Sequence, residues 1–163
     1  MHPLRLAFIA PALLLAPAAS PAPEPTDPLR FFEGRTESQG TVKIIMRKPY
    51  RSRSVGVGKI ESDGSLTLVQ QVHDEGKPVQ QRRWKVRRAG TGRYTATMSE
   101  ASGPVVIDKV GGQYRFRFRM KGNLAAEQMM IPLAGGRTAR NTMKVKRLGI
   151  VVATSEGTIR KVS

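Results

Sequence analysis

Apolar and polar residues mostly alternate along this chain from Thr41 to the C-terminus. In the clearest run, Tyr114, Phe116 and Phe118 share one phase of the segment, and the arginines between them share the other. Successive side chains of a β-strand point to opposite faces, so this period of two predicts strands with one buried face. It argues against a helical domain, because an amphipathic helix places its apolar residues three or four positions apart.

Clusters of glycine, proline, asparagine and aspartate interrupt these runs at intervals of roughly eight to twelve residues. Short strands joined by tight turns predict an antiparallel up-and-down meander, which either closes as a barrel or folds as a sandwich. A closed barrel is favoured, because closure removes the exposed edge strands. We therefore expect an all-β, single-domain antiparallel barrel of about ten strands. The predicted strands are 41–48, 51–61, 65–73, 79–88, 92–99, 104–110, 113–121, 125–133, 137–147 and 149–161.

The chain begins with the three parts of a secretory signal peptide: a basic start, an apolar run and small residues at a cleavage site. We expect a signal peptide over residues 1–18, a proline-rich linker over 19–28 and the barrel domain over 29–163. The apolar run is shorter than the roughly 20 residues that cross a bilayer, and an uncleaved anchor is the alternative interpretation. We accordingly expect export across the inner membrane to the periplasm. No cysteine follows the run, which excludes a lipid-modified N-terminus of the bacterial kind.

Two further segments allow more than one interpretation. Residues 123–130 fit either a short helix or a strand, and we expect a strand because both flanks are strands. Asp27 and Pro28 fit the N-cap and the first position of a single helical turn. We expect this turn to cover one end of the barrel with Phe31 and Phe32.

The chain has 28 Lys and Arg residues against 12 Asp and Glu residues, a formal net charge of +16. The strand pattern places many of these bases on the outside of the barrel. The candidates for contact with an anionic surface are Arg83, Lys85, Arg87, Arg115, Arg117, Arg119, Lys144 and Lys146. They form a continuous cationic wall if their strands are neighbours. The bases either solvate the exterior or bind anionic membrane lipid; nucleic acid is disfavoured, because most aromatic residues lie in the inward phase.

The inward phase of residues 80–86 holds both Arg82 and Trp84. A buried guanidinium needs a carboxylate or an anionic ligand beside it. One interpretation is a structural pair of Arg82 with Glu127 or Glu37, and the other is an anion-binding arginine at the mouth of an apolar pocket. The candidate pocket residues are Arg82, Trp84, Phe116, Phe118, Glu127 and Met129. Such a pocket in a barrel would hold a fatty acid or a similar amphiphile.

Several segments together resemble one family of proteins. They are residues 31–37, 63–68, 81–86, 92–97, 102–104, 141–143 and 146–150. They resemble an uncharacterised bacterial envelope family, domain-of-unknown-function family 3833, and the resemblance extends over roughly residues 29–161. It implies a lipocalin-like, calycin-type barrel without an established activity, and a role in envelope lipids by association with lipid-modifying genes. This chain departs from the family pattern because it lacks the lipoprotein cysteine and is more basic.

The sequence offers no recognisable catalytic motif, and we expect no cofactor and no metal. It has no cysteine and two histidines, and it contains neither a G-x-S-x-G motif nor a P-loop. Glu33 and Glu37 are four residues apart and fit an acid–base pair, but solvated surface carboxylates are favoured. We expect a non-enzymatic barrel that binds a lipid-like or amphiphilic small molecule. The alternatives are a packed barrel that docks on anionic lipid through its basic face, and an enzyme acting on a lipid-related substrate.

Overall fold

The computed structural model of the protein describes residues 27–163, so the predicted signal peptide and nearly all of the predicted linker lie outside the described residues. The described chain contains one short helix and ten strands. Their bounds are α1 Pro28–Phe32, β1 Gly34–Ile44, β2 Tyr50–Ile60, β3 Leu66–Asp74, β4 Gln80–Gly90, β5 Arg93–Met98, β6 Val105–Val110, β7 Gln113–Met120, β8 Leu124–Pro132, β9 Thr138–Arg147 and β10 Ile150–Lys161. In this described part, no helix is both long and apolar enough to cross a membrane.

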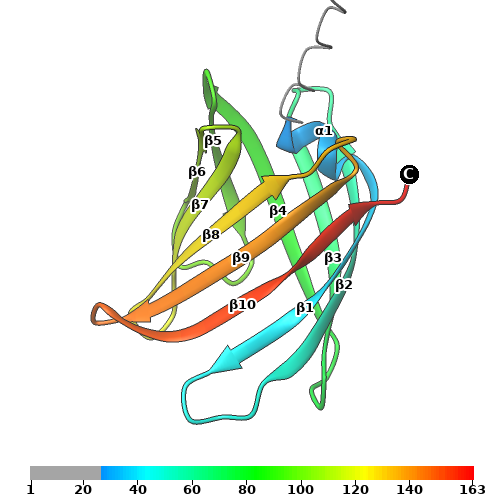
Figure 1. The fold of residues 1–163 in the computed structure, drawn as a ribbon. Coiled ribbons are helices and arrows are strands. Elements are labelled where there is room, and N and C mark those ends of the chain that lie inside the picture. Colours follow the sequence, from blue (N-terminus) through cyan, green and yellow to red (C-terminus); the bar gives the residue numbers. More distant parts are fainter. Residues whose placement is uncertain (1–26) are drawn as a thin grey trace, which may run out of the picture.

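Each strand pairs antiparallel with its neighbours in the sequence, and β1 pairs with β10 to close the barrel (Figure 1). This confirms the predicted all-β antiparallel barrel. The period of two assigns the faces of β7 correctly, because Tyr114, Phe116 and Phe118 are buried and Arg117 and Arg119 are exposed. The ambiguous segment at 123–130 is strand β8, as expected.

The first strand begins earlier than the sequence pattern predicts. β1 starts at Gly34 and ends at Ile44, whereas the predicted strand was 41–48. The residues of β1 that face the barrel interior include Ser38 and Gly40, which are small and carry no apolar side chain. No apolar alternation marks this strand, so hydrophobic periodicity could not find its first half.

Two glycines allow β1 and β10 to lie close together where they close the barrel. Gly40 and Gly157 are direct partners across the two strands. A Cβ atom on Gly40 would lie 2.5 Å from the carbonyl oxygen of Glu156, and one on Gly157 would overlap the backbone of Gln39 and Gly40. These contacts are with backbone, which cannot rotate away as a side chain can. A side chain at either position would force the strands apart, so closure requires both glycines.

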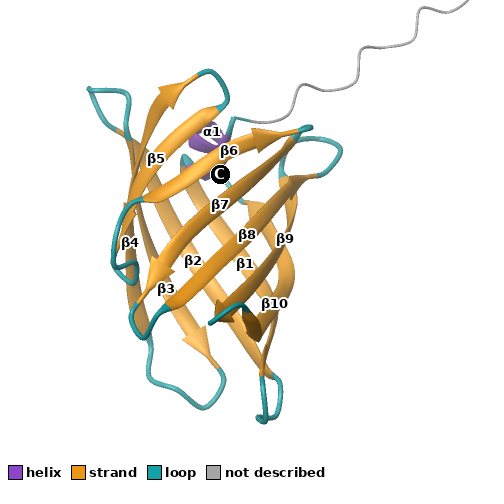
Figure 2. Cartoon of the chain, turned by 90° about the vertical axis from the view of Figure 1, so that its left-hand side faces the viewer, coloured by secondary structure: helices purple, strands orange, loops and turns teal. Residues whose placement is uncertain are grey.

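Helix α1 covers one end of the barrel, as predicted (Figure 2). Phe31 is fully buried and Leu29 nearly so. The carboxylate of Asp27 caps the helix by accepting a hydrogen bond of 3.0 Å from the backbone N–H of Leu29. The helix lies directly against β2 at Gly58, where an added Cβ would overlap the carbonyl oxygen of Phe32.

Asp27 also connects the helix to the barrel wall through an ion pair and a hydrogen bond. Its carboxylate pairs with Arg88 and accepts a hydrogen bond of 3.2 Å from the hydroxyl of Tyr94. The ring of Tyr94 packs edge-on against that of Tyr114, with the centroids 6.2 Å apart. Burial raises the pKa of Tyr94, and it raises the pKa of Tyr114 to about 12. Both phenols therefore stay neutral in the folded protein at a pH where an exposed tyrosine ionises.

We predict that the protein loses stability as the pH rises above about 10. Tyr114 keeps its proton up to pH about 12 in the folded state, whereas an exposed tyrosine in the unfolded chain loses it near pH 10. The unfolded state then binds fewer protons, so the free energy of unfolding falls by up to about 1.4 kcal/mol per pH unit for this residue. Urea unfolding at about pH 8 and about pH 11 measures the fall.

Tyr114→Phe should reduce this fall, because phenylalanine cannot ionise. An identical alkaline loss in the wild type and in Tyr114→Phe would contradict the assignment to the buried phenol.

We also predict that Gly58→Ala destabilises the fold by about 1–3 kcal/mol, because the new methyl group overlaps the helix backbone. Gly103→Ala is the matched control, since a Cβ at Gly103 meets no atom within 4 Å. Thermal unfolding of both variants measures the difference. Equal melting temperatures would show that α1 does not lie directly against Gly58.

Candidate functional site

A cavity of about 250 Å³ lies inside the barrel. Its lining runs from Phe32 of α1 and Leu66 at one end to Tyr50, Asp74 and Gln80 at the other. Because α1 covers one end, a molecule that enters the cavity must come through the other. We call this other end the open end of the barrel.

Small inward residues on three adjacent strands create the cavity. β10, β1 and β2 are neighbours in the barrel. The small cavity-lining residues that they contribute are Ser38, Gly40, Ser52, Ser54, Ser155 and Gly157. The opposite side of the barrel, by contrast, is filled with large buried side chains such as Ile107, Phe116 and Phe118. The cavity therefore lies off-centre, between a wall of small residues and a wall of large ones.

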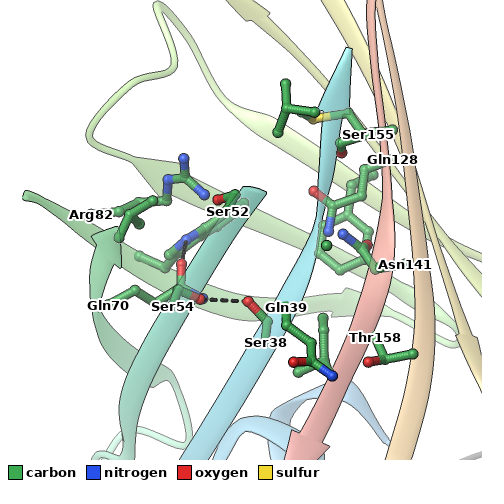
Figure 3. Close-up of a pocket in the computed structure, with 18 of the residues that line it drawn as sticks. Ser38, Gln39, Ser52, Ser54, Gln70, Arg82, Gln128, Asn141, Ser155 and Thr158 are labelled. Carbon is green, nitrogen blue, oxygen red and sulfur yellow. Dashed lines mark hydrogen bonds between the residues drawn. The ribbon is translucent and has the colours of Figure 1, made fainter. Parts of the chain in front are cut away.

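Uncharged hydrogen-bonding groups line the small-residue side (Figure 3). The hydroxyl oxygens of Ser38 and Ser54 lie 2.7 Å apart and share a hydrogen bond. The amide oxygen of Asn141 is buried and has no hydrogen-bond partner among residues 27–163. Leaving a buried acceptor without a partner costs about 1–3 kcal/mol. Asn141 is thus suited to accept a hydrogen bond from a molecule held in the cavity.

The apolar side of the cavity is built around Trp84. Its indole N–H donates a hydrogen bond of 2.9 Å to the side-chain oxygen of Gln70, and its ring packs edge-on against Phe116 at 6.3 Å between centroids. Leu68 is its direct partner on β3. The hydrogen bond and the ring contact together fix the orientation of the indole against the cavity.

Arg82 lies at the open end and is paired with a carboxylate. Its Nε donates a hydrogen bond of 2.7 Å to Glu100, and the two side chains are 31% and 34% exposed. A structural pair was the first interpretation, but both predicted partners were wrong, because Glu127 is exposed and Glu37 pairs with Arg35 outside the cavity. Glu100 lies between β5 and β6, so strand periodicity could not place it.

β8 has the opposite phase to the one predicted. Gln128 lines the cavity and Met130 is fully buried, so Glu127 and Met129 face outward and are not pocket residues. Met129 and Met130 are adjacent, so an apolar residue faces inward in either phase. The polar residue Gln128 faces the cavity, so hydrophobic periodicity could not indicate the correct phase. Of the other candidate pocket residues, Arg82, Trp84 and Phe116 line the cavity, whereas Phe118 is buried in the packed half of the barrel.

The predicted bases of the outer surface lie on β4, β7 and β9, which are not neighbours in the barrel. Acidic residues stand between them. Asp108 on β6 pairs with Arg117 at 2.7 Å and Arg93 at 3.2 Å, and Glu127 on β8 lies between Arg117 and Lys144 in register. The hydrogen bond from Arg117 lowers the pKa of Asp108, which keeps it ionised. The condition for a continuous cationic wall is therefore not met.

The carboxylates considered for acid–base chemistry lie outside the cavity. Glu33 pairs with Arg30 at 3.0 Å and Glu37 with Arg35 at 3.1 Å. The hydrogen bond from Arg35 lowers the pKa of Glu37, which makes it a poor proton donor near neutral pH. Across residues 27–163, His, Asp and Glu side chains form no group of three or more that could hold a metal ion.

A family model described as a protein of unknown function, DUF3833, matches residues 19–161. The chain belongs to this family. The match spans the whole barrel and confirms the resemblance found in the sequence motifs. A search of curated proteins finds no match.

Three solved structures are similar to this barrel in fold. The S-type phycobiliprotein lyase CPES from Guillardia theta has a TM-score of 0.66 and 10% identity, with 83% of this chain and 90% of that chain covered. Rv2717c from M. tuberculosis has a TM-score of 0.62 and 13% identity, with 85% and 99% covered. A DUF3598-family protein of unknown function from Nostoc punctiforme has a TM-score of 0.60 and 12% identity, with 85% and 50% covered. Identities this low establish a common fold and no common function.

We predict that Gln70→Leu destabilises the protein by about 1–3 kcal/mol, because the buried indole N–H of Trp84 loses its acceptor. Gln71→Leu is the matched control, since Gln71 is the next residue of β3 and is exposed on the outer face. Urea unfolding can be followed through the emission of Trp84, the single tryptophan of the chain. Equal stability of the two variants would mean that the hydrogen bond to Gln70 does not support the indole.

Proposed function

We propose that the protein binds a small amphiphilic molecule inside its barrel. The observation that supports this most strongly is the two-sided lining of the cavity, with Trp84 and Phe116 on one side and serine and amide groups on the other. The volume of about 250 Å³ is just below the roughly 300–1,000 Å³ of ordinary ligand pockets. The cavity thus suits a small amphiphile, or one end of a longer one.

The polar part of this ligand carries no net charge in our proposal. Arg82 already has Glu100 as its partner, so an anionic group would have to displace that carboxylate. The other charged lining residues, Asp74 and Glu156, are paired with Lys77 and Arg140. The rest of the polar lining is hydroxyl and amide, and it includes the unpartnered oxygen of Asn141. A hydroxyl group both donates and accepts hydrogen bonds, so it matches Asn141 and the serines together. We therefore propose a hydroxyl-bearing ligand rather than a fatty acid.

Two further observations support a binding role, although both are weaker than the lining of the cavity. A phycobiliprotein lyase shares the fold, which is an analogy of architecture alone. The N-terminal apolar run leads us to propose the periplasm as the compartment, where envelope amphiphiles are available.

Decanediol tests the proposal, with decanoate and decylammonium as comparisons that have the same number of carbon atoms but carry one charged group in place of two hydroxyl groups. We predict that decanediol changes the emission of Trp84 saturably and binds more tightly than either charged compound. The reason is that the cavity offers hydroxyl and amide groups but no unpaired charge at its mouth. Fluorescence titration of the purified protein measures all three affinities.

Ser54→Leu should abolish decanediol binding, because the larger side chain fills the space beside Ser38. Ser54→Ala is the matched control, since it removes the same hydroxyl and leaves the space open. Loss of binding in the leucine variant alone identifies the cavity as the site. No saturable change in the wild type, or equal binding in both variants, would refute the proposal.

A further inference from the structure

Five exposed apolar side chains gather at the open end of the barrel, and we call them the apolar rim: Ile45, Met46, Leu148, Ile150 and Val151. Ile45 and Met46 lie on the β1–β2 connection, Leu148 lies on the β9–β10 connection, and Ile150 and Val151 begin β10. Both connections are in the lower part of Figure 1, away from α1. The two connections are linked, because the backbone N–H of Ile45 donates a hydrogen bond of 2.9 Å to the carbonyl oxygen of Val152. Met46 is 99% exposed and Leu148 is 86% exposed.

The backbone at the two most exposed positions is unfavourable for the residues found there. Met46 has φ of 60° and Leu148 has φ of 49°. This left-handed region favours glycine and asparagine. Because the side chains of Met46 and Leu148 are exposed to water, no burial energy compensates for the unfavourable backbone conformation. Glycine or asparagine at these two positions would make the folded protein more stable. Met46 and Leu148 are therefore better explained by a contact with another molecule than by the stability of the fold.

The opposite end of the barrel does not share this feature. Its large exposed apolar residues are Val57, Val110, Leu133 and Val162, which are 39% to 59% exposed, and none of them approaches the exposure of Met46 or Leu148. Contiguous exposed apolar surface on a water-soluble domain marks a contact with a protein or a membrane. The asymmetry between the two ends places such a contact at the mouth of the cavity.

Basic residues surround the apolar rim. They are Lys43, Arg47, Lys48, Lys146 and Arg147. Neither segment 43–48 nor segment 146–151 contains an acidic residue. Within residues 27–163, none of these five bases has a carboxylate within 4.0 Å. Apolar tips among unpaired cations are the combination that anionic bilayers attract.

We propose that the apolar rim docks on the surface of an anionic phospholipid bilayer, with Met46 and Leu148 inserted among the headgroups. The unpaired bases would contact lipid phosphates, while the rim side chains enter the acyl boundary. A second copy of the chain is a poorer occupant, because each copy has a net charge of +16 and would bring its own unpaired bases to the contact. Of the predicted outer-surface bases on β4, β7 and β9, Lys146 alone belongs to this surface. The proposal does not depend on a ligand in the cavity.

Vesicle flotation tests this proposal on the protein as bacterial cells export and process it. The vesicles are phosphatidylcholine alone, or phosphatidylcholine with about 30% phosphatidylglycerol as the anionic lipid. The wild type should float with the anionic vesicles and much less with the neutral ones. The double variant Met46→Asn/Leu148→Asn should reduce binding about tenfold or more, because both apolar insertions are lost. Asparagine tolerates positive φ, so these substitutions do not strain the turns.

Leu133→Asn/Val162→Asn removes two exposed apolar residues from the other end and is the matched control, with wild-type binding expected. Arg47→Gln/Arg147→Gln should diminish the preference for anionic over neutral vesicles. Urea unfolding of Met46→Asn/Leu148→Asn, followed through the emission of Trp84, shows separately whether the fold is intact.

Three results would overturn the proposal. The first is a wild type that does not float with anionic vesicles. The second is a Met46→Asn/Leu148→Asn variant that floats as well as the wild type, which would assign binding to another part of the chain. The third is an oligomer, seen by analytical ultracentrifugation without lipid, that this double variant dissolves, because the rim would then bind a second copy.

Discussion

The close approach of β1 and β10 at Gly40 and Gly157 is the constraint on which the rest of the structure depends. A side chain at either glycine would overlap backbone of the facing strand. With both glycines in place, β1 pairs with β10 along nearly its whole length and no edge strand is left exposed. The same two glycines leave space on the inner side of the wall. Closure of the barrel and the existence of its cavity therefore have a common origin.

Because of these small residues, the cavity has a polar side and an apolar side. Serines on β1, β2 and β10 continue the small-residue surface around the glycines, and Trp84 and Phe116 face it from the other side of the cavity. Charge contributes little inside, since Arg82 is neutralised by Glu100 at the open end. At the opposite end Asp27 holds α1 against Arg88 and Tyr94, so that end stays closed. The charged residues that line the cavity, Asp74, Arg82 and Glu156, are all paired with residues of opposite charge.

Hydrophobic periodicity predicted the barrel and the strand faces around Phe116, because these parts of the chain follow the rule that apolar residues are buried. The helical turn was predicted from its capping residues, Asp27 and Pro28. The periodicity was wrong where the structure departs from that rule. β1 began earlier than predicted because its inward residues, such as Ser38, are small and polar. The phase of β8 was reversed because Gln128 faces the cavity. Glu100 was missed because it lies in a loop, where no period applies.

Native mass spectrometry of the protein purified from bacterial cells tests most directly whether the cavity holds a molecule in the cell. We expect one bound molecule per chain, released by denaturation and identified in the organic extract as an uncharged amphiphile with at least one hydroxyl group. Ser54→Leu, purified in the same way, should have no bound molecule. A wild-type chain that carries nothing, or the same bound molecule in Ser54→Leu, would contradict the assignment of the cavity as a binding site.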